Sequence, residues 1–475
     1  MEKAKKKKKG IKLPHTLVLI YVIVLMVYAL TWIVPSGQFE RQKVGVAGME
    51  REVTIPGTFK KVEKKYLGPD ILLTAPIKGF SYGALIIAFL FVVGGAFAVI
   101  QATGTIDIAI KKLTRTFSRH PKARMLVIPV LMTVFSLGGS IFGMSEETIP
   151  FIMVFVPLAI SMGYDSIVGV AIPFLGAAAG FAAAFFNPFT VGIAQGLSGL
   201  PLYSGLPYRL FIWVVGTFTV IAFVMRYASK IKKNPKLSPV YELDKKRIFS
   251  GDGKSLDISD WNFRHRAVLQ VFLGGIIILI LGILILNWYI TAIAAVFMGM
   301  GIASGLVSKM TPSDIAKNFV TGARDMMNVA FIIACGRAIL IVASEGQILD
   351  SILYYTSNFI SVFPKIVTAQ MMFFTQSGIN FFIHSGTAQA ALTMPVMAPL
   401  SDLVGVTRQT TVLAFQLCEF VLPILPTSAV TMGVLGVAGI SWEKWARWFM
   451  PLMMILIVLS LILLVPPVIT NWGPF

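Results

Sequence analysis

Apolar runs long enough to cross a lipid bilayer recur along this chain, and they limit its fold more than any other feature. A membrane-spanning helix needs about 20 predominantly apolar residues, and the segments 17–35, 83–102, 209–228 and 447–468 each provide them. Of the 475 residues, 56% are hydrophobic and only 13% are charged, which is too little charge for a soluble protein of this size. The sequence therefore predicts an all-α polytopic membrane protein surrounded by lipid.

Further apolar runs complete the predicted spans, and some of them are interrupted. The other predicted spans are 167–200, 267–286, 289–308, 327–343 and 408–438, of which 167–200 and 408–438 are broken by Pro and polar residues. The stretches 125–161 and 366–403 also carry Gly, Ser and polar residues near their middle. We interpret these two as re-entrant hairpins, which enter and leave the membrane on the same side.

The net charge of +19 predicts orientation in the membrane rather than binding to nucleic acid. Lys and Arg concentrate in the tail 1–16 and in the segments 109–124 and 225–236, which the positive-inside rule assigns to the cytoplasm. With a cytoplasmic N-terminus, the spans bring both segments to the cytoplasm only if 125–161 does not cross. We expect a multi-pass protein with its N-terminus inside and no nucleic-acid partner.

The two halves of the chain share a register of matching residues. The matched pairs are Pro157 with Pro399 and Gly163 with Gly405, 242 residues apart, and Pro69 with Pro312 and Gly79 with Gly322, 243 residues apart. The segment 104–124 is strongly basic, whereas its counterpart 346–366 has only Lys365. The same element therefore ends inside in one half and outside in the other, which predicts an inverted repeat of the kind found in many secondary transporters.

These features divide the chain into four parts. We predict a cytoplasmic basic tail over 1–16, a first half over 17–228, a cytoplasmic linker over 229–265 and a second half over 266–475. In the first half, 36–66 is predicted to be an extracellular loop with strand-like pieces, followed by the hairpin 125–161 and the broken helix 167–200. In the second half, the hairpin 366–403 precedes the broken helix 408–438.

Polar residues gather at the two hairpin tips and the two broken helices. Carbonyl groups and small hydroxyl or amide side chains at such breaks can ligate a dehydrated cation, and free amides at helix N-termini can hold a carboxylate. The alternative is that Ser, Thr and Pro only tolerate kinks, but four paired breaks favour a function. The uncharged residues predicted here to bind substrate are Ser145, Asn187, Pro188, Asn380, Ser385, Gly386, Thr387, Thr427 and Ser428.

Charged and ionisable residues inside the apolar regions are costly and indicate function by default. Glu146 and Glu147 lie at the first tip, His384 begins the second, and Glu419 lies in the second broken helix. We add these four to the predicted substrate site. Arg337 also lies within a span, where an internal ion pair with a carboxylate is an equal alternative to a role in binding.

Signals of other protein classes are missing from the sequence. It contains no GxxxxGK[ST], HExxH or CxxC pattern, so it predicts neither an ATP-driven pump nor a metal centre. His384 and Ser385, being adjacent, are poorly placed for catalysis. A channel would need a continuous polar pore, whereas the breaks suggest a closed central site. We therefore expect a transporter, not an enzyme, with no cofactor beyond Na⁺ or H⁺ as a coupling ion.

The same residues carry a resemblance to a known family. The broken spans "NPFTVGIAQG" and "LPTSAVTMG", with the hairpins and the inverted register, resemble the ion transporter superfamily. Within it, "GMSEETIPF" and "LPHTLVLIYVIVLMVYALTWIVPSGQF" are similar to the YfcC family, whose members are described as C4-dicarboxylate anaerobic carriers or basic amino acid antiporters. The resemblance covers nearly the whole chain.

The resemblance implies a homodimer in a bacterial cytoplasmic (inner) membrane, with a scaffold and a transport domain that moves like an elevator. In sodium-coupled relatives, ions bind where each hairpin tip meets the neighbouring broken span. This implies ion-binding roles for Ser145 with Asn187, and for Thr387 with Thr427 and Ser428. The relatives' Ser-Asn-Thr tip triplet is replaced here by "SEE" and "SGT".

The leading functional prediction is secondary transport or exchange of a small amino acid, preferably basic, such as arginine or ornithine. The carboxylate pair at the first tip suits a cationic group, and hairpin amides suit its α-carboxylate. The alternative is a C4-dicarboxylate or related organic acid coupled to sodium or protons, held by Arg337, amides and hydroxyls. Unprotonated Glu146 and Glu147 would repel such a dianion.

Overall fold

The computed structural model describes residues 16–46, 49–106, 108–109, 112, 121–249, 262–286, 288 and 290–473 of the chain. Almost all of the predicted tail 1–16, much of the basic segment 109–124 and part of the predicted linker 229–265 lie outside the described residues. Within the described part, six helices are long and apolar enough to cross a membrane. This agrees with the predicted polytopic and mostly helical architecture.

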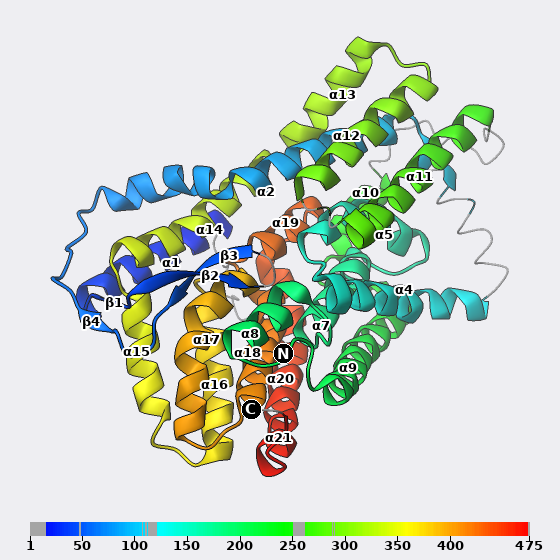
Figure 1. Cartoon of the computed structure of the whole chain (residues 1–475). Helices are drawn as coiled ribbons and strands as arrows, with labels where there is room; N and C mark the ends of the chain where they lie inside the picture. Colours follow the sequence, from blue (N-terminus) through cyan, green and yellow to red (C-terminus); the bar gives the residue numbers. More distant parts are fainter. Residues whose placement is uncertain are drawn as a thin grey trace, which may run out of the picture.

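The first half is built from helices and a small β region (Figure 1). Its helices are α1 (Thr16–Ile33), α2 (Ile71–Ala102), α4 (Pro121–Phe142), α5 (Ile149–Ser161), α6 (Ser166–Val170), α7 (Gly176–Ala182), α8 (Ile193–Leu197) and α9 (Leu206–Lys233), with the short turns η1 (Glu146–Thr148), η2 (Ala171–Leu175) and η3 (Pro188–Gly192). Its strands are β1 (Gly37–Gln38), β2 (Arg41–Val46), β3 (Met49–Thr54) and β4 (Lys60–Lys61).

Among the described residues, the linker and second half contain helices joined by short loops and no strands. The elements are η4 (Pro235–Leu237), α10 (Tyr241–Phe249), α11 (Phe263–Leu286), α12 (Ile290–Val307), α13 (Pro312–Asp325), α14 (Met327–Glu345), α15 (Leu349–Ile360), α16 (Lys365–Asn380), α17 (Gly386–Leu403), α18 (Arg408–Leu417), η6 (Cys418–Ile424), α19 (Ala429–Val437), α20 (Trp442–Leu463) and α21 (Val465–Ile469).

Three parts of this architecture differ from the sequence prediction or extend it. The strand-like pieces in 36–66 form two antiparallel pairs, β1 with β4 and β2 with β3, so the all-α class describes only the rest of the described chain. Helix α2 begins at Ile71 rather than near residue 83. Helix α13 was not predicted as an element; Thr311 caps it by accepting a hydrogen bond from the Asp314 amide at 3.1 Å, and Pro312 occupies its first position.

Two sets of helices pack mainly among themselves. The α2–α14 group contains α1, α2 and α11–α14, and the hairpin group contains α4–α9 and α16–α21. Contacts between the groups run chiefly through α14 and α19. In Figure 1, α1, α2 and α14 lie together at the upper left, and the hairpin group occupies the centre and lower part.

Glycines allow helices to meet backbone to backbone inside each group. A Cβ atom added to Gly180 of α7 would lie 1.8 Å from the carbonyl oxygen of Ser136 in α4, and one added to Gly139 would lie 2.1 Å from that of Ala177. In the α2–α14 group, a Cβ atom on Gly79 would lie 2.1 Å from the carbonyl oxygen of Ala334. Such small-residue contacts are typical of helix packing in membranes, where close approach supplies the attraction.

The order of helices in the first half recurs in the second. The sequence α2, α4–α5, α6–α8 and α9 is followed by α13–α14, α16–α17, α18–α19 and α20. The matched glycines Gly163 and Gly405 both have positive φ, +76° and +68°. Each ends a helix with the same 6→1 bond, from Tyr164 N to the Ala159 carbonyl at 2.9 Å and from Val406 N to the Ser401 carbonyl at 2.8 Å.

The linker helix α10 is attached to both halves of the hairpin group. Asp165, which caps α6, accepts hydrogen bonds from Tyr227 Oη at 2.5 Å and Ser238 Oγ at 2.6 Å. Asp244 of α10 accepts one from the Ser166 amide at 2.8 Å, and Arg247 donates to the carbonyl of Ala438 at the end of α19. Burial raises the pKa of both Asp165 and Asp244 above that of a free aspartate.

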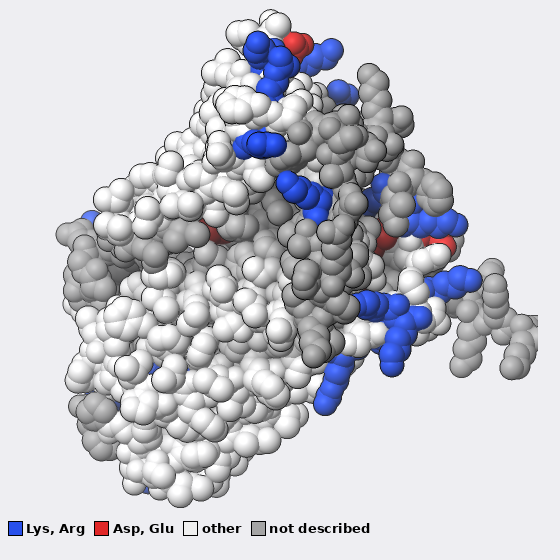
Figure 2. Space-filling view, turned by 90° about the vertical axis from the view of Figure 1, so that its right-hand side faces the viewer, with Lys and Arg blue, Asp and Glu red and all other residues white. Residues whose placement is uncertain are grey.

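The surface carries its charge at the margins. Figure 2 shows a face on which Lys and Arg side chains gather toward the right-hand side and the top, while a broad area remains without charged residues. An uncharged surface bordered by basic residues is the distribution expected for a protein embedded in lipid.

Candidate functional site

A cavity of about 310 Å³ lies between the two hairpin tips, the two broken helices and α14. Its volume falls within the range of about 300–1,000 Å³ usual for small-molecule sites. It lies at the junction of the two helix groups, because Arg337 of α14 and Trp288 between α11 and α12 face the hairpin group across it. Its other lining residues include the polar Ser145, Glu146, Glu147, Thr190, His384, Ser385, Thr387 and Ser428 and the aromatic Phe142, Phe181, Phe186 and Phe189.

The two carboxylates of the first tip have different surroundings. Glu147 folds back on its own turn, where Oε2 accepts a hydrogen bond from the Ser145 amide at 2.9 Å. Thr148 closes the same turn by donating to the Ser145 carbonyl at 2.6 Å. Glu146 instead interacts electrostatically with the guanidinium of Arg337. Of the two tip carboxylates, Glu146 is therefore the one that interacts with Arg337, which also lines the cavity.

The second tip is joined to both broken helices. His384 Nε2 and Thr427 Oγ1 share a hydrogen bond of 2.5 Å, which links the tip to the break before α19. Thr387 Oγ1 donates to the Phe189 carbonyl at 2.8 Å, which links it to η3 of the first half. Arg337 also interacts electrostatically with His384. The cavity thus combines two carboxylates, a guanidinium and an imidazole.

Several of the predicted polar residues serve as helix caps. Asn187 Oδ1 accepts from the Phe189 amide at 2.9 Å, Ser385 Oγ from the Ala388 amide at 3.4 Å, and Ser428 Oγ from the Thr431 amide at 3.3 Å. N-caps of this kind hold one of the otherwise unpaired amides at a helix start. These side chains therefore have a structural task in the breaks, whatever else they bind.

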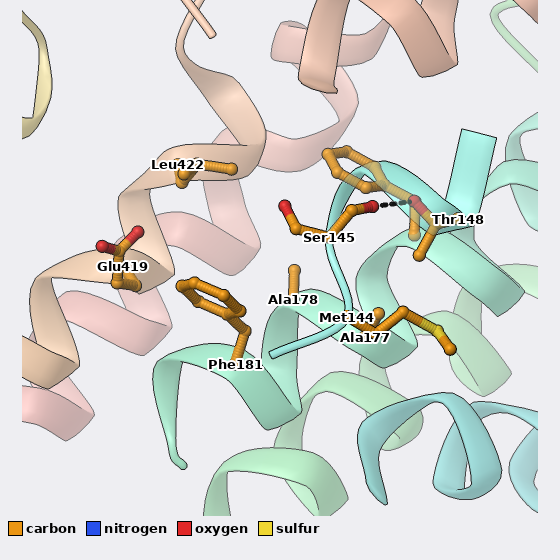
Figure 3. Close-up of a pocket in the computed structure, with 9 residues that line it drawn as sticks. Met144, Ser145, Thr148, Ala177, Ala178, Phe181, Glu419 and Leu422 are labelled. Carbon is orange, nitrogen blue, oxygen red and sulfur yellow. Dashed lines mark hydrogen bonds between the residues drawn. The ribbon is translucent and has the colours of Figure 1, made fainter. Parts of the chain in front are cut away.

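The predicted site residues fall into two sets. Nine line the cavity of about 310 Å³: Ser145, Glu146, Glu147, Pro188, His384, Ser385, Gly386, Thr387 and Ser428. Four do not line it: Asn187, Asn380, Glu419 and Thr427. Of these four, Asn187 stands next to the first tip, since a Cβ atom on Gly143 would lie 2.8 Å from its Oδ1. Glu419 lines an adjoining cavity of about 10 Å³ beside Ser145 and Thr148 (Figure 3), and Ser145, Phe181 and Leu422 line both cavities.

Some lining residues were not in the predicted set. The sequence leaves the role of Arg337 open, because it cannot show which carboxylate lies near this residue. Phe186, Phe189 and Thr190 lie within "FFNPFT", and Phe142 directly precedes the first tip, so proximity to a break was the available signal for these residues. Trp288 lies outside every predicted break and gave none. Among the described residues, no cluster of His, Cys, Asp and Glu could hold a metal ion.

Comparison with known proteins identifies relatives over almost the full length. The model of the DcuC family, described as C4-dicarboxylate anaerobic carrier, matches residues 13–468. YfcC of Escherichia coli (strain K12), provisionally named a basic amino acid antiporter, is 37% identical over 88% of this chain and 89% of its own. An uncharacterized protein of Haemophilus influenzae (strain ATCC 51907 / DSM 11121 / KW20 / Rd) is 28% identical over 90% of this chain and 91% of its own.

Two solved structures are also similar in outline. The YdaH transporter of Alcanivorax borkumensis has a TM-score of 0.41 and 16% identity, over 97% of this chain and 100% of its own. MtrF of Neisseria gonorrhoeae, described within a class of antimetabolite efflux pumps, has a TM-score of 0.39 and 15% identity, over 96% and 95%.

The resemblance noted in the sequence is confirmed by the family match and by the identity to YfcC. The homologues are membrane transporters or carriers, not enzymes. The chain therefore belongs to the DcuC family of membrane transporters, as a relative of YfcC.

Proposed function

We propose that this transporter exchanges small amino acids, preferably basic ones such as arginine or ornithine, across a bacterial cytoplasmic membrane. The observation that carries the proposal is the placement of opposite charges on the cavity wall: Glu146 and Glu147 on the hairpin group, and Arg337 on α14. A basic amino acid carries an anionic and a cationic group. Arg337 can hold the α-carboxylate while Glu146 holds the side-chain cation. The provisional name of YfcC supports the same substrate class.

The alternative substrate is a C4-dicarboxylate, as the family description suggests. Arg337 and His384 would favour one carboxylate of such a solute. Glu146 and Glu147 oppose the second, because two unprotonated carboxylates beside a dianion repel it. The balance of charges around the cavity therefore favours the amino acid.

The division into two helix groups supports an elevator-like motion within this proposal. Both hairpins and both broken helices belong to the hairpin group, so they can move together past the α2–α14 group. The contacts between the two groups run through α14 and α19. At this interface Gly336 has no side chain that would hinder sliding, and a Cβ atom on it would lie 3.3 Å from the Thr427 carbonyl oxygen. Re-entrant hairpins related by an inverted repeat, and assembly as a homodimer, belong to the same proposal.

Basic residues support a cytoplasmic N-terminus. Lys230, Lys232 and Lys233 lie in the last turn of α9, and the turn between α12 and α13 contains Lys309. Both positions fall on the cytoplasmic side when the spans are counted from an inside N-terminus. Either Na⁺ or H⁺ can serve as the coupling ion in this arrangement.

The test is a ligand panel followed by an exchange assay. Purified protein is screened by thermal shift against amino acids and C4-dicarboxylates, each with and without sodium. Proteoliposomes loaded with arginine or ornithine should then take up labelled arginine faster than empty ones, which a channel would not do. Stabilisation by succinate with no response to arginine or ornithine would replace the proposed substrate with the alternative.

A further inference from the structure

Helix α9 carries an exposed apolar face along the part that is long and apolar enough to cross a membrane. Phe211, Val214 and Phe218 are all exposed, and Phe218 is 70% so. Their spacing of three and four residues places them on one side of the helix. The described helices that pack on α9, chiefly α4, α7 and α20, lie against its other sides. In a membrane protein, the face at Phe218 is therefore turned to lipid.

The same face leads into a groove at the end of the helix. Ala222 follows Phe218 by four residues, and Arg226 follows Ala222 by four more, so the three positions lie in one row along the helix. At Arg226 an open groove of about 530 Å³ begins. Its lining side chains among the described residues all belong to α9: Met225, Arg226, Ser229, Lys230 and Lys233. An apolar face and a basic groove are thus continuous on one helix.

The three cations of the groove have no anionic partner in the described part of the chain. Arg226, Lys230 and Lys233 are exposed, and no carboxylate of a described residue forms an ion pair with them. Lys230 follows Arg226 by four residues and Lys233 follows Lys230 by three, which makes them neighbours on the helix surface. Like charges at these spacings repel one another. An anion in the groove would remove that repulsion.

Two general effects explain part of this cluster. Cations in the last turn of a helix complement its dipole, and basic residues mark the cytoplasmic ends of spans. Arg226, however, lies seven residues before Lys233, about two turns earlier, where the dipole has little effect. Lys232 also lies in the last turn, but its Nζ is 5.6 Å from the centre of the Tyr164 ring and it does not line the groove. Neither effect explains why three cations and a hydroxyl line one groove.

We infer that this groove binds the phosphate headgroup of an anionic phospholipid, with an acyl chain of the same lipid along the apolar face at Phe218. The Arg226 guanidinium can donate two parallel hydrogen bonds to phosphate oxygens, and Ser229 can donate one from its hydroxyl. Lys230 and Lys233 add point charges. Phe218 lies eight residues from Arg226, about 12 Å along the helix. This distance falls within the roughly 15 Å of hydrocarbon that one leaflet of the bilayer provides.

The test measures lipid binding to the purified full-length protein in a neutral detergent, with no amino acid present. Thermal unfolding is followed while phosphatidylglycerol is added to the micelles, with phosphatidylcholine and water-soluble glycerol phosphate as separate arms. We expect phosphatidylglycerol alone to raise Tm in a saturable way, since a ligand of the native state stabilises it. In the double variant Arg226→Gln/Lys230→Gln, the apparent affinity for phosphatidylglycerol should fall at least about tenfold, because two charges that face the headgroup are lost.

The matched control is the double variant Lys232→Gln/Lys236→Gln, which removes the same net charge next to the groove but not from its lining. All four substituted positions are exposed, so both variants should unfold near the wild-type Tm without lipid. The control should keep the wild-type affinity for phosphatidylglycerol.

Three results would overturn the inference. Equal stabilisation by phosphatidylglycerol and phosphatidylcholine would show that the headgroup charge is not recognised. Equal loss of affinity in the two double variants would show that only net charge counts. A response to glycerol phosphate as large as that to phosphatidylglycerol would show an anion site without a lipid. Saturable binding of phosphatidylglycerol, without any response to arginine or ornithine, would retain this site and refute the proposed substrate.

Discussion

Replacing Glu146 by glutamine removes one negative charge from the cavity wall while keeping nearly the same shape. Of the two tip carboxylates, this one interacts electrostatically with Arg337, whereas Glu147 Oε2 accepts a hydrogen bond from the Ser145 amide at 2.9 Å. We therefore expect Glu146→Gln to weaken binding of arginine or ornithine strongly, and Glu147→Gln to do so much less. The glutamine at position 147 can still accept the Ser145 hydrogen bond through its amide oxygen.

The size of the effect follows from the half-buried position of Glu146. Two unit charges about 4 Å apart interact by about 4 kcal/mol at an effective dielectric constant of about 20. Solvent screening at a half-buried site reduces this to about 2 kcal/mol, which agrees with the lower limit for truncating a buried charge pair. That corresponds to about a thirtyfold rise in Kd for the basic amino acid.

The assay is ligand binding by thermal shift or calorimetry on both variants, followed by exchange in proteoliposomes. Neutral amino acids, which lack the side-chain cation, serve as the internal comparison and should bind Glu146→Gln nearly as well as the wild type. For a C4-dicarboxylate, the same substitution should leave affinity intact or improve it. Equal Kd values for arginine in the wild type and both variants would show that these carboxylates do not set the charge preference.

Three further predictions address other parts of the structure. Arg337→Gln should weaken the binding of all amino acids alike, by about 2 kcal/mol, because it removes the partner of the α-carboxylate. In a binding assay, a loss of affinity for basic amino acids alone would contradict this role. Gly180→Ala should destabilise the protein by about 1–3 kcal/mol, visible as a lower Tm, whereas Gly274→Ala, where a Cβ atom meets nothing within 4 Å, should not. Glu50→Cys should react with an impermeant thiol reagent on intact cells and Lys232→Cys should not; the reverse pattern would invert the proposed topology.

The sequence predicts the membrane-spanning helices well, because the thickness of the bilayer sets the length of apolar sequence that they need. The spans follow from apolar length, and α1, α9, α12 and α14 lie close to the predicted segments. The helix α13 is amphipathic and contains no long apolar run, so a search for apolar runs does not predict it. Its Thr311 cap is nevertheless a recognisable helix-start signal in the sequence. The early start of α2 depends on packing, since Gly79 meets the backbone of α14.

The candidate site was predictable in its location but not in its division of tasks. The breaks in the apolar runs indicated the tips, and nine of the predicted residues do line one cavity. Which polar groups act as caps, as Asn187 and Ser428 do, depends on backbone direction that the sequence does not give. The same is true of Glu419, whose unpaired oxygens become visible only when its neighbours' hydrogen bonds are known.

The cavity wall is shared between two helix groups, and under the proposed motion this raises the energy barrier for movement of the empty carrier. Arg337 belongs to the α2–α14 group and Glu146 to the hairpin group, so sliding one group past the other separates their charges. The empty carrier must therefore lose the attraction between Glu146 and Arg337 in order to move, and this slows its change between the two sides of the membrane. A bound amino acid supplies a carboxylate to Arg337 and a cation to Glu146. Each of these two charges then has a partner of opposite sign while the helix groups move. A transporter built in this way favours one-for-one exchange over net release, because the loaded forms cross the barrier more readily than the empty one.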